Sequence, residues 1–210
     1  LSSWGLNPSS SSLIASGFLI TVYGSIGMLL IGAAMHIVPE LGGTDLATEK
    51  NATLMSLIWT LAVFVMFVAT NNPEILGFKI MIVSTVLINL ALLAIIVNLL
   101  ITAASRSKKM PLPGWMMIIG LISAPISVVS LVLSGSIDTG IGQWLATRMA
   151  GTTFFLMLSG ALLYGASRGS GNPLWSRSLA AVTLSGAIIT ISPAGLIEGD
   201  VAADFLALDK

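Results

Sequence analysis

The chain has no cysteine, a single histidine and few charged side chains. Of its 210 residues, 9% are charged and 55% are hydrophobic, whereas soluble domains carry about 25% charged residues. Without cysteine, the chain cannot form a disulfide, a thiolate zinc site or an iron–sulfur cluster of its own. Its 9 basic and 9 acidic residues balance, and no basic block stands out, so nucleic acid is not an expected partner. This composition predicts a protein of the lipid bilayer.

Long apolar runs dominate the sequence. A helix needs about 20 mostly apolar residues to cross the hydrocarbon layer, and six segments qualify: 13–38, 52–70, 76–104, 115–134, 144–167 and 178–197. Because backbone polar groups find no water in lipid, these segments are expected to be helices. We predict an all-α, polytopic membrane helix bundle with six transmembrane helices. Its expected parts are a polar N-terminal lead-in (1–12), the transmembrane domain (13–197) and an acidic C-terminal tail (198–210).

Basic residues between the predicted spans set the expected orientation. Arg106, Lys108 and Lys109 follow the third span, and Arg168 and Arg177 follow the fifth. Both loops fall on the same side of the membrane, which the positive-inside rule makes cytoplasmic. Both termini are then expected on the outer, periplasmic or extracellular side of a prokaryotic-type cytoplasmic (inner) membrane.

A few polar residues inside the spans are candidates for chemistry. Asn89, Asn98, Arg148, Thr152 and Thr153 could line a channel for a heme, a quinone or a substrate. Structural roles are the alternative, because asparagine amides bond across membrane helices and an arginine near a helix end can reach water. We find neither a nucleophile–base pair nor a phosphate-binding loop, and we predict no catalytic residue.

The only histidine, His36, lies in the stretch GAAMHIVPELGG. Glu40 follows four residues later, a spacing that places both side chains on one face of a helix, and Pro39 is expected to end that helix. Together with Asp45 and Glu49, these residues could form an oxygen-rich metal site. A transition metal usually takes more imidazole or thiolate ligands, so a histidine that only packs at the membrane interface is the alternative.

Four segments form an ordered series along the chain: GMLLIGAAMHIVPELGGTDLATEKNATLMSLIWTLAVFVMF, LINLALLAIIVNLLITAASRSKKMPLPGWMMIIGLISAPISVV, WLATRMAGTTFFLMLSGALLYG and LSGAIITISPAGLIEG. This series resembles helices two to seven of the catalytic subunit I of the heme–copper oxidase superfamily, in particular its nitric oxide reductase and cbb3-type branch. The similar features include a Pro-Glu turn after a glycine- and alanine-rich helix end and a basic loop with Met-Pro after an asparagine-bearing helix.

The metal ligands that this resemblance implies are missing from the sequence. The family's ligand histidines and its glutamate align with or near these residues: Ser16 or Gly17, Ala146, Ala150, Pro193 and Ala194. Heme iron needs axial side chains such as His, Met, Cys or Tyr. The resemblance therefore implies a scaffold of the family that has lost its heme and copper ligands.

Three functions are expected from these observations. The first is a non-catalytic integral membrane subunit of a respiratory or other electron-transfer complex, with other membrane subunits and lipid as partners and no cofactor on this chain alone. The second is a half-site subunit that lines a heme, quinone or substrate channel with a partner chain, where Arg148 could pair with heme propionates. The third is a small membrane transporter, for which Pro125 could break the fourth span.

Overall fold

The computed structural model describes residues 20–71, 73–136 and 140–171, with short pieces at 178, 181–182 and 185–186. In these parts of the chain it contains helices and no strand. The elements are a π-helical segment η2 (Ile20–Ile26), followed by α2 (Gly27–Gly42), α3 (Glu49–Asn71), α4 (Pro73–Ala104), α5 (Leu112–Ser136) and α6 (Gly140–Ser170). The all-α prediction is confirmed for this part of the chain.

Among the described residues, five helices are long and apolar enough to cross a membrane, over the windows Tyr23–Gly42, Glu49–Val68, Ile82–Ala104, Leu112–Ser130 and Met149–Ser170. They correspond to the first five predicted spans, and they make the chain an integral membrane protein. Most of the sixth predicted span, 178–197, lies outside the described residues. The predicted lead-in (1–12) and tail (198–210) lie outside them as well.

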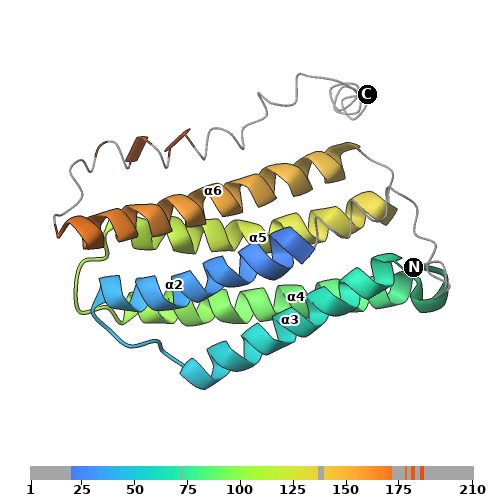
Figure 1. Cartoon of the computed structure of the whole chain (residues 1–210), viewed down its shortest axis with the longest axis horizontal. Helices are drawn as coiled ribbons and strands as arrows, with labels where there is room; N and C mark the ends of the chain where they lie inside the picture. Colours follow the sequence, from blue (N-terminus) through green and yellow to red (C-terminus); the bar gives the residue numbers. More distant parts are fainter. Residues whose placement is uncertain are drawn as a thin grey trace.

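The helices pack as two antiparallel pairs with α2 laid across them. α3 packs along α4, α5 packs along α6 in the most extensive contact of the structure, and α4 joins the two pairs through α5. In Figure 1, α6, α5, α4 and α3 follow one another from top to bottom, and α2 lies across the middle of the row. Because α2 contacts α4, α5 and α6, the core lies where these helices meet.

Two glycines allow α5 and α6 to approach closely. A Cβ atom built on Gly120 would lie 2.8 Å from Cγ of Met157, and one built on Gly160 would lie 2.8 Å from Cγ of Met117 and 2.9 Å from the carbonyl oxygen of Pro113. Real Cβ atoms essentially never come that close. Small residues at such contacts are the usual means by which membrane helices pack, since lipid provides no hydrophobic force between them.

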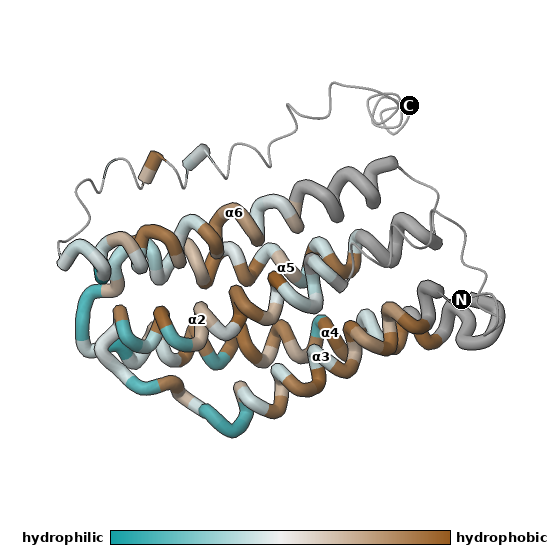
Figure 2. The backbone as a smooth tube through the Cα atoms, in the orientation of Figure 1, coloured by the Kyte–Doolittle hydropathy of each residue, from teal (hydrophilic) through white to brown (hydrophobic). Residues whose placement is uncertain are grey.

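The loops 43–48 and 105–111 lie at one end of the bundle, together with the C-terminal end of α6 (Figure 1). Figure 2 shows hydrophilic colours gathered in these loops and hydrophobic colours along the helices. The two loops are tied together, because the N–H groups of Ser107 and Lys108 donate to the carbonyl oxygen of Gly42 at 3.0 and 3.1 Å. We call this end of the molecule the loop end.

The prediction that Pro39 ends the first helix was wrong. α2 continues through Pro39 to Gly42. A proline removes one backbone donor from a helix, and bonds from Gly43 and Thr44 beyond it close the last turn. The helix ends one turn later, where Gly43 adopts a left-handed conformation (φ 62°). The N–H of Gly43 donates to the carbonyl of Glu40 and that of Thr44 to the carbonyl of Pro39, both at 3.2 Å, which is the Schellman pattern.

Candidate functional site

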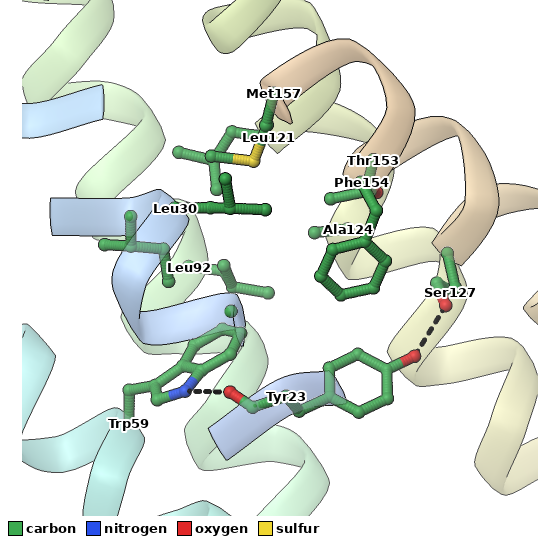
Figure 3. A pocket seen from close by; sticks show the side chains of 13 residues that line it. Tyr23, Leu30, Trp59, Leu92, Leu121, Ala124, Ser127, Thr153, Phe154 and Met157 are labelled. Carbon is green, nitrogen blue, oxygen red and sulfur yellow. Dashed lines mark hydrogen bonds between the residues drawn. The ribbon is translucent and has the colours of Figure 1, made fainter. Parts of the chain in front are cut away.

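A small cavity lies in the interior, where η2 and the five helices converge (Figure 3). Its lining is mostly apolar and includes Tyr23, Leu30, Trp59, Leu92, Leu121, Ala124, Phe154 and Met157. The space open to the centre of a water molecule is only about 20 Å³, which is close to the least that holds one water. Ligand pockets usually measure about 300–1,000 Å³, so the cavity does not admit a quinone ring or a porphyrin.

Polar groups beside the cavity bond between helices. The hydroxyl oxygens of Tyr23 and Ser127 lie 2.7 Å apart, and the indole Nε1 of Trp59 donates to the carbonyl oxygen of Tyr23 at 3.0 Å (Figure 3). The hydroxyls of Ser123 and Thr153 join α5 to α6 at 2.8 Å. These bonds hold η2 against α3 and α5, and their geometry is that of interhelical packing contacts.

The described residues do not fit a heme or copper site of their own. The only histidine, His36, lies near the end of α2 with 75% of its side chain exposed. Ala150, the position where the resemblance would align a glutamate, is buried and places a methyl group at the cavity wall. The other positions that the resemblance would align are Ser16, Gly17, Pro193 and Ala194, which lie outside the described residues, and Ala146, whose side chain lies outside them.

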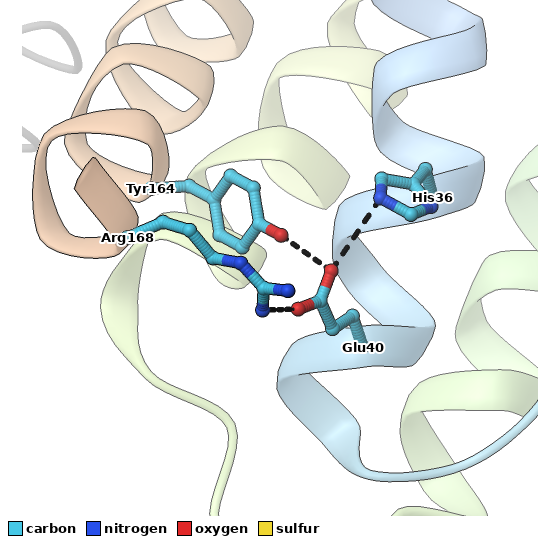
Figure 4. A network of polar contacts seen from close by, with 4 residues as sticks. All are labelled: His36, Glu40, Tyr164 and Arg168. Atoms are coloured by element: carbon cyan, nitrogen blue, oxygen red, sulfur yellow. Dashed lines mark hydrogen bonds and ion pairs between the residues drawn. The ribbon is translucent and has the colours of Figure 1, made fainter. Parts of the chain in front are cut away.

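Glu40 is the centre of a polar cluster at the loop end (Figure 4). Tyr164 of α6 donates its hydroxyl to Oε2 of Glu40, and Arg168 of α6 donates from Nη1 to Oε1. Nε2 of His36 lies 3.4 Å from Oε2. The side chain of Glu40 is 29% exposed and that of Arg168 is 68% exposed. The cluster therefore joins the C-terminal ends of α2 and α6 at the edge of the apolar region.

Among the described residues, no third ligand joins His36 and Glu40 in the metal site that was the alternative for this histidine. His36 and Glu40 share one face of α2, as their spacing predicted. However, the carboxylate of Glu40 is already bound by Tyr164 and Arg168. In the part of the chain that the structure describes, no three or more His, Cys, Asp or Glu side chains gather as they would around a metal ion.

Asn98, one of the candidate cofactor-binding residues, is buried and binds the backbone of another segment. Its Oδ1 accepts from the N–H of Thr48 at 3.1 Å, and its Nδ2 donates to the carbonyl of Thr48 at 2.9 Å. Thr102, one turn further along α4, accepts from the N–H of Ala47 at 3.0 Å. Asn98 therefore fastens the loop between α2 and α3 onto α4, and both halves of its amide are already engaged.

The other candidates have different surroundings. Asn89 donates from Nδ2 to the carbonyl of Thr85 at 2.9 Å and lies beside a groove between α4 and α5. Thr152 and Thr153 are buried. Arg148 belongs to α6, and its side chain lies outside the described residues. The structure thus separates Asn89 from Asn98 and does not bring the candidates together in one site.

Sequence reasoning missed Tyr23, Trp59 and Tyr164, which make the polar contacts between distant helices. A signal was available, because the chain has only 2 tyrosines and a buried Tyr or Trp usually finds a hydrogen-bond partner. Their positions inside apolar spans therefore indicate that such partners exist, although the sequence does not identify them.

No protein-family model, no curated protein and no solved structure matches the chain. The resemblance to the heme–copper oxidase superfamily stays a prediction from the sequence.

Proposed function

We propose that the chain is a non-catalytic integral membrane subunit of an electron-transfer complex. The observation that supports this most directly is the composition of its interior. The polar side chains beside the cavity bond across helices to other side chains or to the backbone, and Ala150 stands where the resemblance aligns a glutamate. An interior of this kind maintains a helix bundle, and the described lining of its cavity contains no histidine for a heme iron.

The outer surface supports a role among other membrane components. Leu57, Leu61 and Phe64 follow one face of α3 and are 64%, 65% and 59% exposed. Phe155 and Leu162 expose 49% and 64% on α6. In a bilayer, such faces are covered by lipid or by the helices of other subunits, which are the proposed partners.

The alternative half-site function depends on fewer residues than the sequence suggested. Asn98 is engaged with Thr48 on both sides of its amide. A shared heme, quinone or substrate channel would then rely on Arg148, Asn89, Thr152 and Thr153, and we rank it below the non-catalytic subunit.

The proposed orientation places the loop end in the cytoplasm of a prokaryotic-type cell. This end carries Lys50, Arg106, Lys108, Lys109 and Arg168. The positive-inside rule makes the side of the membrane with these basic residues cytoplasmic.

Isolation of the native assembly tests the proposed function. The tagged chain would be extracted from its host's membranes in a mild detergent, and the co-purifying chains identified by mass spectrometry and quantified. We expect stoichiometric membrane subunits that carry redox centres. A chain that reproducibly purifies without any redox subunit, while the same preparation keeps other membrane complexes intact, would contradict the proposal.

A further inference from the structure

The amide of Asn89 has an acceptor that no donor satisfies. Its Nδ2 donates one hydrogen bond to the carbonyl of Thr85, while Oδ1 is covered by other atoms and accepts none. Among the buried side-chain nitrogen and oxygen atoms that the structure describes, this is the one without a partner. An amide oxygen left without a donor in an apolar surrounding is unfavourable, so the arrangement indicates a missing partner.

The depth of Asn89 in the membrane limits what that partner can be. Asn89 lies 7 residues inside the window Ile82–Ala104 and 13 residues inside the predicted span 76–104. At a rise of 1.5 Å per residue, it is about 10–20 Å from the nearer end of the span. Lipid headgroups and interfacial water lie outside the hydrocarbon layer, which is about 30 Å thick. Another transmembrane helix can bring a donor to this depth.

The surface beside Asn89 has the form of a helix-packing seam. A groove of about 270 Å³ runs along α4 and is bordered by Val129 of α5. Along α4, Ile82, Val86, Leu93 and Val97 expose 39%, 51%, 49% and 52% of their area. With Asn89, these residues recur every three or four positions, as the contact residues of paired helices do. We call these five residues of α4 the α4 seam.

We propose that the α4 seam is the interface of a parallel homodimer in which Asn89 pairs with Asn89 of a second copy. Two copies insert into the membrane in the same orientation, so a two-fold axis along the membrane normal brings equal depths of α4 together. The Asn89 amide has one N–H and its oxygen unused, and two such amides satisfy each other reciprocally.

In the dimer, the Asn89 side chain of each copy rotates so that its Oδ1, which is covered in the single chain, faces the α4 seam of the other copy. A single asparagine within an apolar seam is a known means of fixing the register and the number of paired helices. The dimer is independent of the proposed function, because a subunit of a larger complex can be present as two copies or as one.

Cross-linking tests the interface without altering Asn89. The natural chain has no cysteine, so single-cysteine variants need no prior substitution. Val86→Cys and Leu93→Cys in the seam would be compared with Leu57→Cys and Leu61→Cys on the exposed face of α3. Under mild oxidation in native or reconstituted membranes, we expect disulfide-linked dimers from the seam variants and little from the α3 variants. Monomers from all four variants, or equal cross-linking on α3, would overturn the proposal.

The role of the amide is tested by the dimerisation constant in detergent or liposomes, measured by energy transfer between labelled copies. The reciprocal pair has two interhelical hydrogen bonds, which together contribute enough to change an equilibrium roughly 8- to 300-fold. We expect Asn89→Ala to weaken the dimer by about that factor and Asn89→Gln, which keeps the amide, to weaken it less. An Asn89→Ala chain that folds and dimerises like the natural chain would show that the amide does not form the interface.

Discussion

Asn98 of α4 binds both backbone groups of Thr48, 50 residues earlier in the chain. The side-chain amide of Asn98 accepts from the N–H of Thr48 and donates to the carbonyl of Thr48. It thus makes hydrogen bonds of the kind that a neighbouring backbone segment makes in a helix or a sheet. The loop 43–48 is not part of a helix or a sheet, and α4 holds it in place just before α3 begins. The start of α3 is therefore positioned by a side chain of the helix beside it.

Replacing Asn98 by alanine is expected to destabilise the protein by about 1–3 kcal/mol. The variant leaves the N–H of Thr48 without its partner at a partly buried position, whereas the carbonyl of Thr48 still accepts from the N–H of Ala52. A buried donor without an acceptor carries most of its desolvation cost. The matched control is Asn51→Ala, since Asn51 is exposed in the first turn of α3 and surface changes usually stay within about 0.5 kcal/mol. Unfolding in mixed detergent, followed by circular dichroism, measures both. Equal stability of the two variants would contradict the role given to Asn98.

The hydrogen bond between Tyr23 and Ser127 is expected to couple η2 to α5. Tyr23→Phe and Ser127→Ala each remove one hydroxyl, and the double variant completes the cycle. Interhelical hydrogen bonds in membrane proteins contribute about 0.6 kcal/mol on average and up to about 1.7 kcal/mol. We expect a coupling energy in this range from the unfolding free energies of the four proteins. Strictly additive effects would mean that the two hydroxyls do not interact.

Glycine substitutions are expected to have opposite effects at two positions of α6. Gly160→Ala would bring a Cβ within 2.9 Å of a backbone oxygen and 2.8 Å of Met117, so α5 and α6 must separate, at about 1–3 kcal/mol. Gly165→Ala meets no atom within 4 Å, and alanine is favoured over glycine in a helix by up to about 1 kcal/mol. Melting temperatures of both variants provide the measurement. A Gly160→Ala protein as stable as Gly165→Ala would show that the close approach of the helices is unimportant.

Single cysteines also test the proposed orientation. Asp45→Cys lies at the loop end, and Asn71→Cys lies at the end of α3, on the opposite side of the bundle. With a membrane-impermeant maleimide on intact cells, we expect labelling of Asn71→Cys, whereas Asp45→Cys should react only after the cells are opened. The reverse pattern would place the loop end outside and contradict the positive-inside assignment.

The spans were predictable because lipid leaves the backbone few choices. A run of about 20 apolar residues must satisfy its own peptide groups, so helices follow from composition alone. The end of α2 was less predictable, because Pro39 discourages a helix locally and yet the last turn is closed by bonds from residues that follow it. There the left-handed Gly43 and its Schellman bonds decide where the helix ends.

The roles of individual polar residues depend on contacts that the sequence does not contain. Asn89 and Asn98 lie on the same helix and have the same chemistry, so one hypothesis covered both. Packing then distinguishes them, since Asn98 meets the loop before α3 and Asn89 faces a groove. Likewise, Tyr23 finds Ser127 104 residues away, and Glu40 finds Arg168 128 residues away. Separations of this size become contacts only through the arrangement of the whole bundle.

The most direct test of the proposed function is a reduced-minus-oxidised spectrum of the isolated chain, with heme, copper and iron quantified against protein. We predict no heme and no metal in stoichiometric amount on the chain separated from its partners, and redox centres only in the chains that accompany it. A stoichiometric heme that stays with the isolated chain and is lost in His36→Ala would contradict the proposal and make His36 an axial ligand.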